Sequence, residues 1–268
     1  MKTKQNNQYH ITRLLCAGMV ALCASTASAV IIDDFQSYTS GTDLVGQGPW
    51  IAGFAPTISG TNITVQDIGA GAKVAQFFDN SASTLSARLQ PPIASGSNTL
   101  SYTARISSVV DSADTSWFSA TLNSGLGINS ALDPTFTLGF GNNNTVIWLA
   151  NFTALTGATA NNSVTVGDWY KFDITYDFTH TQGDLNTNYA NFTVTNLTTP
   201  GVLTTQSLSW ANQNGGRTVL GAIDFITGST HADSTYQLDN IAFVPEPSSF
   251  ALLGVGLAGL GLVRRRRN

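Results

Sequence analysis

The chain has 268 residues, of which 42% are hydrophobic and only 10% are charged. All sixteen acidic residues, but only five of the twelve basic ones, lie between Val30 and Pro247, so this part carries a net charge of −11 at pH 7, against −4 for the whole chain. A surface this acidic repels phosphate backbones, and we therefore expect no nucleic-acid partner.

The N-terminus has the layout of a secretory signal peptide. Three positive charges come first, at Lys2, Lys4 and Arg13. An apolar stretch follows over residues 14–23, and Ala27 and Ala29 then supply the small side chains of an A-x-A cleavage site. This order predicts a signal peptide over residues 1–29, export by the Sec route, and cleavage by signal peptidase between Ala29 and Val30.

Both cysteines, Cys16 and Cys23, lie inside this leader. The exported protein is therefore expected to hold no disulfide, although it enters an oxidising compartment, and no thiolate for metal binding or nucleophilic attack. Residues 30–243, which we expect to form one domain, are long enough to be stabilised by a hydrophobic core alone.

Apolar and polar residues alternate along this domain with the period of a β-strand. The clearest case is Tyr170–Phe178, where aromatic or aliphatic side chains occupy every even position and Lys, Asp or Thr every odd one. This pattern predicts a half-buried strand. Its predicted partner is Ala190–Leu197, with Phe192 and Val194 facing inward.

Similar segments recur along the rest of the domain. Further strands are predicted at residues 100–106, 118–122, 136–140, 219–226 and 236–244. Residues 146–150 are apolar at both parities, as expected for a strand that is covered on both faces. About a dozen short strands separated by turn-forming clusters predict an all-β fold, an antiparallel two-sheet β-sandwich.

Three segments carry a resemblance to known sandwiches. They are residues 32–38 (IDDFQSY), 167–176 (GDWYKFDITY) and 236–243 (YQLDNIAF). They resemble concanavalin A-like (laminin G-like) jelly rolls, in which the first and last strands lie side by side, although galactose-binding-type sandwiches begin and end in similar ways. The resemblance implies that the domain binds a glycan or matrix. This is an expectation, because fold alone does not fix function.

The predicted pairing of the first and last strands would bring four oxygen-bearing side chains together: Asp33, Asp34, Asp239 and Asn240. The parity of apolar positions also shifts between Leu238 and Ile241, which suggests a β-bulge there. Carboxylate and amide oxygens are calcium ligands, so we predict a structural Ca²⁺ near these residues. The alternative is that they cap turns in solvent, and no cofactor is expected to be required.

Tryptophan side chains can stack against sugar rings. Most of the five tryptophans lie in apolar strand patterns, where a core position is expected. Trp50, which follows Gly48 and Pro49, and Trp117, which follows the polar segment 111–116, have the most loop-like surroundings. They are our candidates for glycan stacking.

Signals of catalysis are almost absent. Only His180 and His231 remain after removal of the leader, too far apart for a compact metal motif. Glu246 is the only glutamate, so a glycosidase with a pair of glutamates is excluded, and a pair of aspartates is unmarked. We expect no enzyme, with a carbohydrate-active hydrolase or lyase as a less favoured alternative.

The C-terminus combines three signals in a fixed order. Pro245, Glu246 and Pro247 form a stiff break that no helix should run through. Residues 248–263 contain no charge. As a helix they would span roughly 24 Å, somewhat less than the hydrocarbon core of a bilayer. Residues 264–267 are four arginines that should stay cytoplasmic.

Residues 244–268 closely resemble the PEP-CTERM sorting signal of Gram-negative bacteria. The matching parts are Pro245-Glu246-Pro247, the apolar segment and Arg264, Arg265, Arg266 and Arg267. The resemblance implies recognition by a membrane-embedded exosortase, in a host that makes exopolysaccharide. Two alternatives are an ordinary stop-transfer helix and a buried apolar helix.

These features favour an exported protein with a transient inner-membrane anchor, which ends at the cell surface or outside the cell. We expect its sandwich to associate with polysaccharide or matrix through many weak polar contacts, without catalysis. The alternative is a purely structural surface or biofilm protein with no small-ligand site.

Overall fold

The computed structural model describes residues 30–53, 62–79, 85–89, 94–95, 97–109, 117–123, 134–141, 146–150, 158–177, 188–209, 219–220, 222–228 and 234–245. The predicted signal peptide, Glu246, Pro247, the apolar segment 248–263 and the arginines lie outside these residues, as do His180 and His231. Within the described ranges, no helix has the length and apolar character needed to cross a membrane.

The described strands form two large antiparallel sheets and one small one. The eight-stranded sheet contains β1 (Val30–Asp33), β3 (Ile63–Asp67), β4 (Lys73–Asp79), β7 (Ser97–Ser108), β12 (Tyr170–Asp177), β13 (Asn188–Asn196), β14 (Gly201–Ser209) and β17 (Ser234–Pro245). The seven-stranded sheet contains β2 (Trp50–Ala52), β5 (Leu85–Leu89), β8 (Trp117–Asn123), β9 (Pro134–Gly141), β10 (Val146–Ala150), β11 (Ala158–Ser163) and β16 (Ala222–Gly228). The third pairs β6 (Ala94–Ser95) with β15 (Val219–Leu220).

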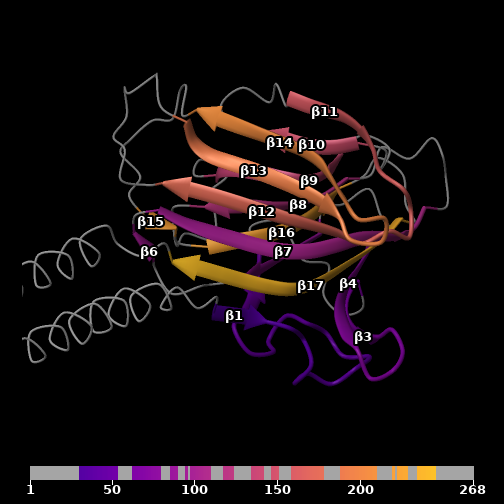
Figure 1. Ribbon diagram of the computed structural model, residues 1–268. Helices are drawn as coiled ribbons and strands as arrows, with labels where there is room; N and C mark the ends of the chain where they lie inside the picture. Colours follow the sequence, from indigo (N-terminus) through magenta and orange to yellow (C-terminus); the bar gives the residue numbers. More distant parts are fainter. Residues whose placement is uncertain are drawn as a thin grey trace, which may run out of the picture. The chain divides into compact units, whose positions relative to one another are not determined.

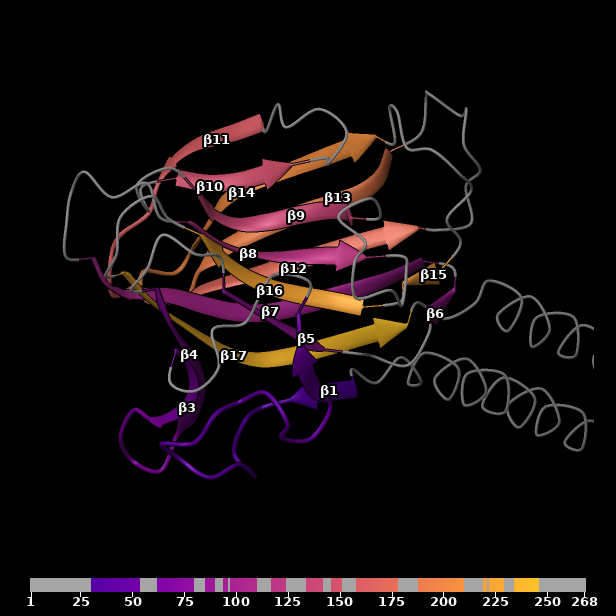
Figure 2. The same cartoon turned by 180° about the vertical axis from the view of Figure 1, so that it is seen from behind.

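The order of the strands confirms the predicted all-β, two-sheet sandwich. The eight-stranded sheet runs β14-β13-β12-β7-β17-β4-β3, and β1 pairs with β17. The seven-stranded sheet runs β11-β10-β9-β8-β16-β5-β2. Figure 1 looks onto the first sheet and Figure 2 onto the second. The first and last strands of the domain are therefore neighbours, as the resemblance to jelly rolls implied.

One predicted strand is wrong in its extent. Residues 219–226 were expected to form a single strand, but they are divided between the two-residue β15 and the longer β16, which belong to different sheets. Gly221 stands between them in the sequence. The residues on both sides of Gly221 are apolar, so the pattern did not show that they pair with different strands.

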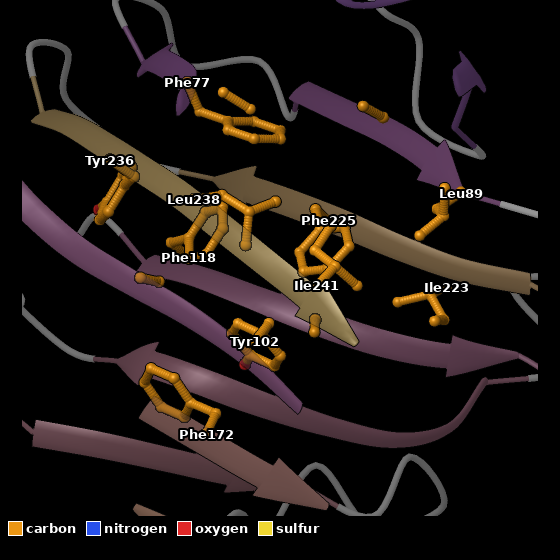
Figure 3. Packing of buried hydrophobic residues seen from close by; sticks show 14 of the residues in the cluster. Phe77, Leu89, Tyr102, Phe118, Phe172, Ile223, Phe225, Tyr236, Leu238 and Ile241 are labelled. Atoms are coloured by element: carbon orange, nitrogen blue, oxygen red, sulfur yellow. The ribbon is translucent and has the colours of Figure 1, made fainter. Parts of the chain in front are cut away.

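Aromatic side chains from both sheets fill the space between them. Tyr102 stacks on Phe172 with ring centroids 4.8 Å apart, and Phe225 of the other sheet meets Tyr102 edge-on at 5.5 Å. Phe118 of the seven-stranded sheet likewise stacks on Tyr236 of the eight-stranded sheet, with ring centroids 5.3 Å apart. Figure 3 shows these rings converging between the sheets. Each such pair adds about 0.5–1.5 kcal/mol beyond the burial of apolar area.

β17 changes its facing at the predicted position. Tyr236 and Leu238 are buried, and so are Ile241 and Phe243, so the parity of the inward side chains shifts between Leu238 and Ile241. Asn240, between them, has a φ of 51°. A residue in the left-handed region is one way in which a strand accommodates an extra residue, so the expected shift in parity is present.

Candidate functional site

The carboxylate of Asp33, one of the predicted calcium ligands, is occupied by donors of the chain itself. Its side chain is buried, with 6% exposure. One oxygen, Oδ1, accepts a hydrogen bond from the backbone N–H of Phe35 at 2.8 Å. The other, Oδ2, accepts from the hydroxyl of Tyr38 at 2.6 Å and from the indole Nε1–H of Trp50 at 2.5 Å. Asp33 therefore ties three segments together at the end of β1.

The negative charges of Asp33 and Asp34 act on the carboxyl group of Asp239, which lies near them. Burial raises the pKa of the Asp239 carboxyl to about 6; the backbone N–H of Asn240 opposes this shift, and the negative charges of Asp34 and Asp33 add to it. Both oxygens of Asp239 accept hydrogen bonds from Asn240, from its backbone N–H at 2.8 Å and its side-chain amide at 2.7 Å. The structure therefore brings the predicted acidic residues together.

Donors of the chain itself already bond to the oxygens of Asp33 and Asp239. In the part of the chain that the structure describes, no group of three or more Asp, Glu, His or Cys side chains is arranged to hold one. Calcium binding there stays a prediction from the sequence.

The prediction that Trp50 stacks against sugars is wrong. Its side chain is 1% exposed and packs against Phe35 at 5.7 Å and Phe225 at 5.8 Å between ring centroids. The ring lies inside the core and its one polar atom is used by Asp33. Trp117 is the first residue of β8, and its role as a stacking residue stays a prediction because its side chain lies outside the description.

A different tryptophan, Trp169, lies on the outer face of the eight-stranded sheet. Its loop is fixed at both sides: Gly167 N–H donates to Ile106 O at 2.8 Å, and Leu197 N–H donates to Trp169 O at 2.8 Å. Trp169 N–H donates to the hydroxyl of Thr198 at 2.9 Å. Gly167 has a φ of +94°, which glycine adopts without strain. The turn thus places a partly exposed indole beside β7.

From Trp169, a row of polar side chains crosses the outer face of this sheet. The guanidinium carbon of Arg105 lies 4.7 Å from the centre of the Trp169 ring. Arg105 Nε donates to Gln237 Oε1 at 2.7 Å, and Gln237 Nε2 donates to Gln76 Oε1 at 3.1 Å. These four residues, which we call the Arg105 row, come from the loop before β12 and from β7, β17 and β4.

Hydroxyl groups cover the same face next to this row. Those of Thr99 and Thr175 lie 2.8 Å apart across β7 and β12. Ser101 donates to Asp173 at 2.6 Å, and Lys171 pairs with the same carboxylate at 2.9 Å. All five side chains are partly exposed. The face offers many uncharged hydrogen-bonding groups, and its Lys171 and Asp173 charges neutralise each other.

Sequence reasoning missed the Arg105 row because its members are far apart in the chain. Trp169 was expected in the core, with the tryptophans other than Trp50 and Trp117, but it is partly exposed. The neighbours of Trp169 depend on the pairing of β12 with β7 and of β7 with β17, which the sequence does not state.

Comparison with known proteins gives one match at the C-terminus. Residues 243–267 match the PEP-CTERM protein-sorting motif. The match covers the segment that the sequence had marked, and the motif implies an exported protein with a membrane-associated C-terminal sorting signal. No curated protein sequence matches the chain.

Solved structures with a similar arrangement are mostly lectins. Lectin II from Ulex europaeus is 12% identical, with a TM-score of 0.45, over 79% of this chain and 99% of that one. The seed lectin of Lotus tetragonolobus is 12% identical, with a TM-score of 0.42, over 78% and 99%. A carbohydrate esterase, vb_24B_21 from the Shiga toxin-encoding bacteriophage phi24B, is 13% identical, with a TM-score of 0.46, over 81% and 98%.

Proposed function

We propose that this protein is an exported, non-catalytic surface protein that associates with extracellular polysaccharide or matrix. Signal peptidase removes residues 1–29 after Sec export, and an exosortase acts at Pro245-Glu246-Pro247 while the apolar segment holds the chain in the inner membrane. The arginines at 264–267 stay in the cytoplasm because moving them across a bilayer is costly. The processed body then reaches the cell surface or the medium.

The outer face of the eight-stranded sheet is the observation that supports association with a glycan. It presents hydroxyl and amide groups at alternate positions of neighbouring strands, with an indole at one end. Sugars offer hydroxyls at their edges and C–H groups on their ring faces, and such a surface complements both through many weak contacts. Sites for sugars and other small molecules combine a few placed polar groups with aromatic side chains in this way.

Export and sorting are tested on the tail. Glu246→Ala, or neutral residues in place of Arg264–Arg267, should leave uncleaved protein in the inner membrane, while Ser249→Ala, outside the Pro-Glu-Pro and arginine parts of the signal, should be processed normally. Mass spectrometry of the protein from membranes and from culture medium measures this. Normal release of the Glu246→Ala protein, or an intact Asn268 in the medium, would contradict exosortase processing.

Association with glycans is tested with a glycan array probed with the protein purified from its host. Binding to any defined sugar supports the proposal, and silence favours a purely structural surface or biofilm protein. Turnover of a glycan that is lost on changing an aspartate to asparagine would instead establish a carbohydrate-active enzyme.

A further inference from the structure

We propose that the Arg105 row is a binding track for one chain of a neutral polysaccharide, lying across the strands of the eight-stranded sheet. The inference rests on the proposed association with polysaccharide and goes further by naming the site and the class of ligand. Trp169, Arg105 and Gln76 would contact the sugars, and Gln237 is a positioning residue between them.

The loop that carries the indole at one end of the track is held in place before any ligand arrives. Asn196, 9% exposed, donates from Nδ2 to Asp168 Oδ2 at 2.8 Å, and its Oδ1 accepts from the backbone N–H groups of Thr198 at 2.9 Å and Thr199 at 2.8 Å. Asp168 directly precedes Trp169 in the chain, and the hydroxyl of Thr198 accepts a hydrogen bond from the backbone N–H of Trp169. A loop fixed in this way loses little conformational freedom on binding.

The middle of the track is organised by a buried amide. Gln237 is 6% exposed, accepts from Arg105 and donates to Gln76, so these two hydrogen bonds run in the same direction along the row. Such a chain of bonds polarises its members. Among the described residues, no hydrogen-bond partner occupies the Nη atoms of Arg105 or Nε2 of Gln76. Arg105 and Gln76 are both partly exposed, so these N–H donors would be available to the hydroxyl oxygens of a sugar.

Exposed apolar side chains lie on the loop of Trp169 and on segments near it. Val166, in the loop of Trp169, is 47% exposed, Leu197, bonded to the backbone of Trp169, is 45% exposed, and Val202, opposite Thr195, is 65% exposed. Val166 and Leu197 thus lie on the segments beside Trp169, and Val202 lies on β14, with β13 between it and β12. They suit the C–H face of a sugar ring next to donors for its hydroxyls.

The charge of the protein favours a neutral chain over an acidic one. The exported part carries a net charge of −11. Asp34 and Asp239 add negative charge where β1 and β17 pair. A polyanion would therefore be repelled before it reached Arg105, the single cation of the row. Neighbouring strands lie about 4.8 Å apart, so a row across three neighbouring strands and the adjoining loop is roughly 14 Å long. That length holds several sugar units of an extended chain.

The test uses the mature protein, purified from its host after processing. Its retention is measured on insoluble neutral β-glucan (cellulose and curdlan) and on acidic alginate. We expect retention on at least one neutral glucan and weaker retention on alginate. Trp169→Ala and Arg105→Ala should each weaken retention about tenfold or more, and Arg105→Lys should not restore it because lysine lacks the planar fork. Ile51→Ser, an exposed apolar residue on the other sheet, is the matched control and should bind normally.

The outcomes separate failure of the site from failure of the function. Retention of the unaltered protein with no loss in the Trp169 and Arg105 variants would overturn the track while keeping the association with glycans. No retention on either glucan, or tighter retention on alginate, would overturn the neutral ligand. Gln237→Met should keep the fold, as monitored by circular dichroism, and weaken retention; normal retention would remove its positioning role.

Discussion

Arg88 and Asp224 face each other across the neighbouring strands β5 and β16 and form a two-pronged ion pair with both side chains completely buried. Arg88 Nε donates to Asp224 Oδ1 at 2.9 Å, and the second guanidinium nitrogen donates to Oδ2 at 2.9 Å. The next residue along β16, Phe225, points into the core. The ion pair thus lies on the opposite face of the seven-stranded sheet from the core.

Removing one partner of this pair should destabilise the protein strongly. Arg88→Met leaves the Asp224 carboxylate buried without its main counter-charge, which typically costs about 3–5 kcal/mol in the free energy of unfolding. Urea denaturation followed by tryptophan fluorescence measures the loss. The double variant Arg88→Met/Asp224→Leu removes both charges and should recover much of it; equal stability of the single and double variants would mean that the pair is not coupled.

Trp50→Phe tests the buried hydrogen bond to Asp33. Phenylalanine keeps an aromatic ring between Phe35 and Phe225 but removes the Nε1–H donor, so Asp33 Oδ2 retains only the Tyr38 hydroxyl. We expect a loss of about 1–3 kcal/mol, because a buried acceptor loses a partner. Trp169→Phe is the matched control on a partly exposed residue and should change stability by less than about 0.5 kcal/mol. Equal effects of the two substitutions would refute this role for Trp50.

The raised pKa of Asp239, in the part of β17 near Asp33 and Asp34, predicts a contribution to stability that falls as pH rises. The pKa of Asp239 is raised to about 6 in the folded protein, so the folded state binds a proton more tightly than the unfolded chain does. The contribution is complete below about pH 4, the ordinary range of an aspartate, and is lost as pH rises through about 6. Because Asp239 is partly exposed, we expect a modest effect.

Asp239→Asn isolates this contribution from the other carboxylates. The asparagine cannot ionise, so the difference in melting temperature between the unaltered protein and the variant should change between pH 4 and pH 7, in favour of the variant at the higher pH. Scanning calorimetry at both values measures it. A difference that stays constant over this range would mean that Asp239 titrates normally.

Calcium provides a separate test of the same residues. The oxygens of Asp33 and Asp239 already accept hydrogen bonds from the chain, and the alternative to a calcium site, in which these residues cap turns, predicts the same melting temperature in calcium and in chelator. A higher melting temperature in calcium that disappears in Asp33→Asn would show that these donors give way to the ion. The structural calcium predicted from the sequence would then be present.

The strands of the sandwich were predictable where the pattern of side chains is local. Tyr170 to Asp177 form β12 as the alternation indicated, and Phe192 and Val194 face inward from β13. The division at Gly221 was not predictable, because Val219-Leu220 and Ala222-Ile223 are apolar alike and only their partners, β6 and β5, separate them.

The sequence by itself identified the C-terminal sorting motif and the type of fold. Charge, hydrophobicity and proline act locally at the two termini, and the period of two acts locally along each strand, so neither requires knowledge of distant partners. Only the tertiary structure decided which tryptophan is outside. Trp50 follows a loop-like sequence but enters the core because Asp33, seventeen residues away, accepts its N–H. Trp169 directly precedes β12 and is partly exposed, and β7 brings Arg105 to its ring.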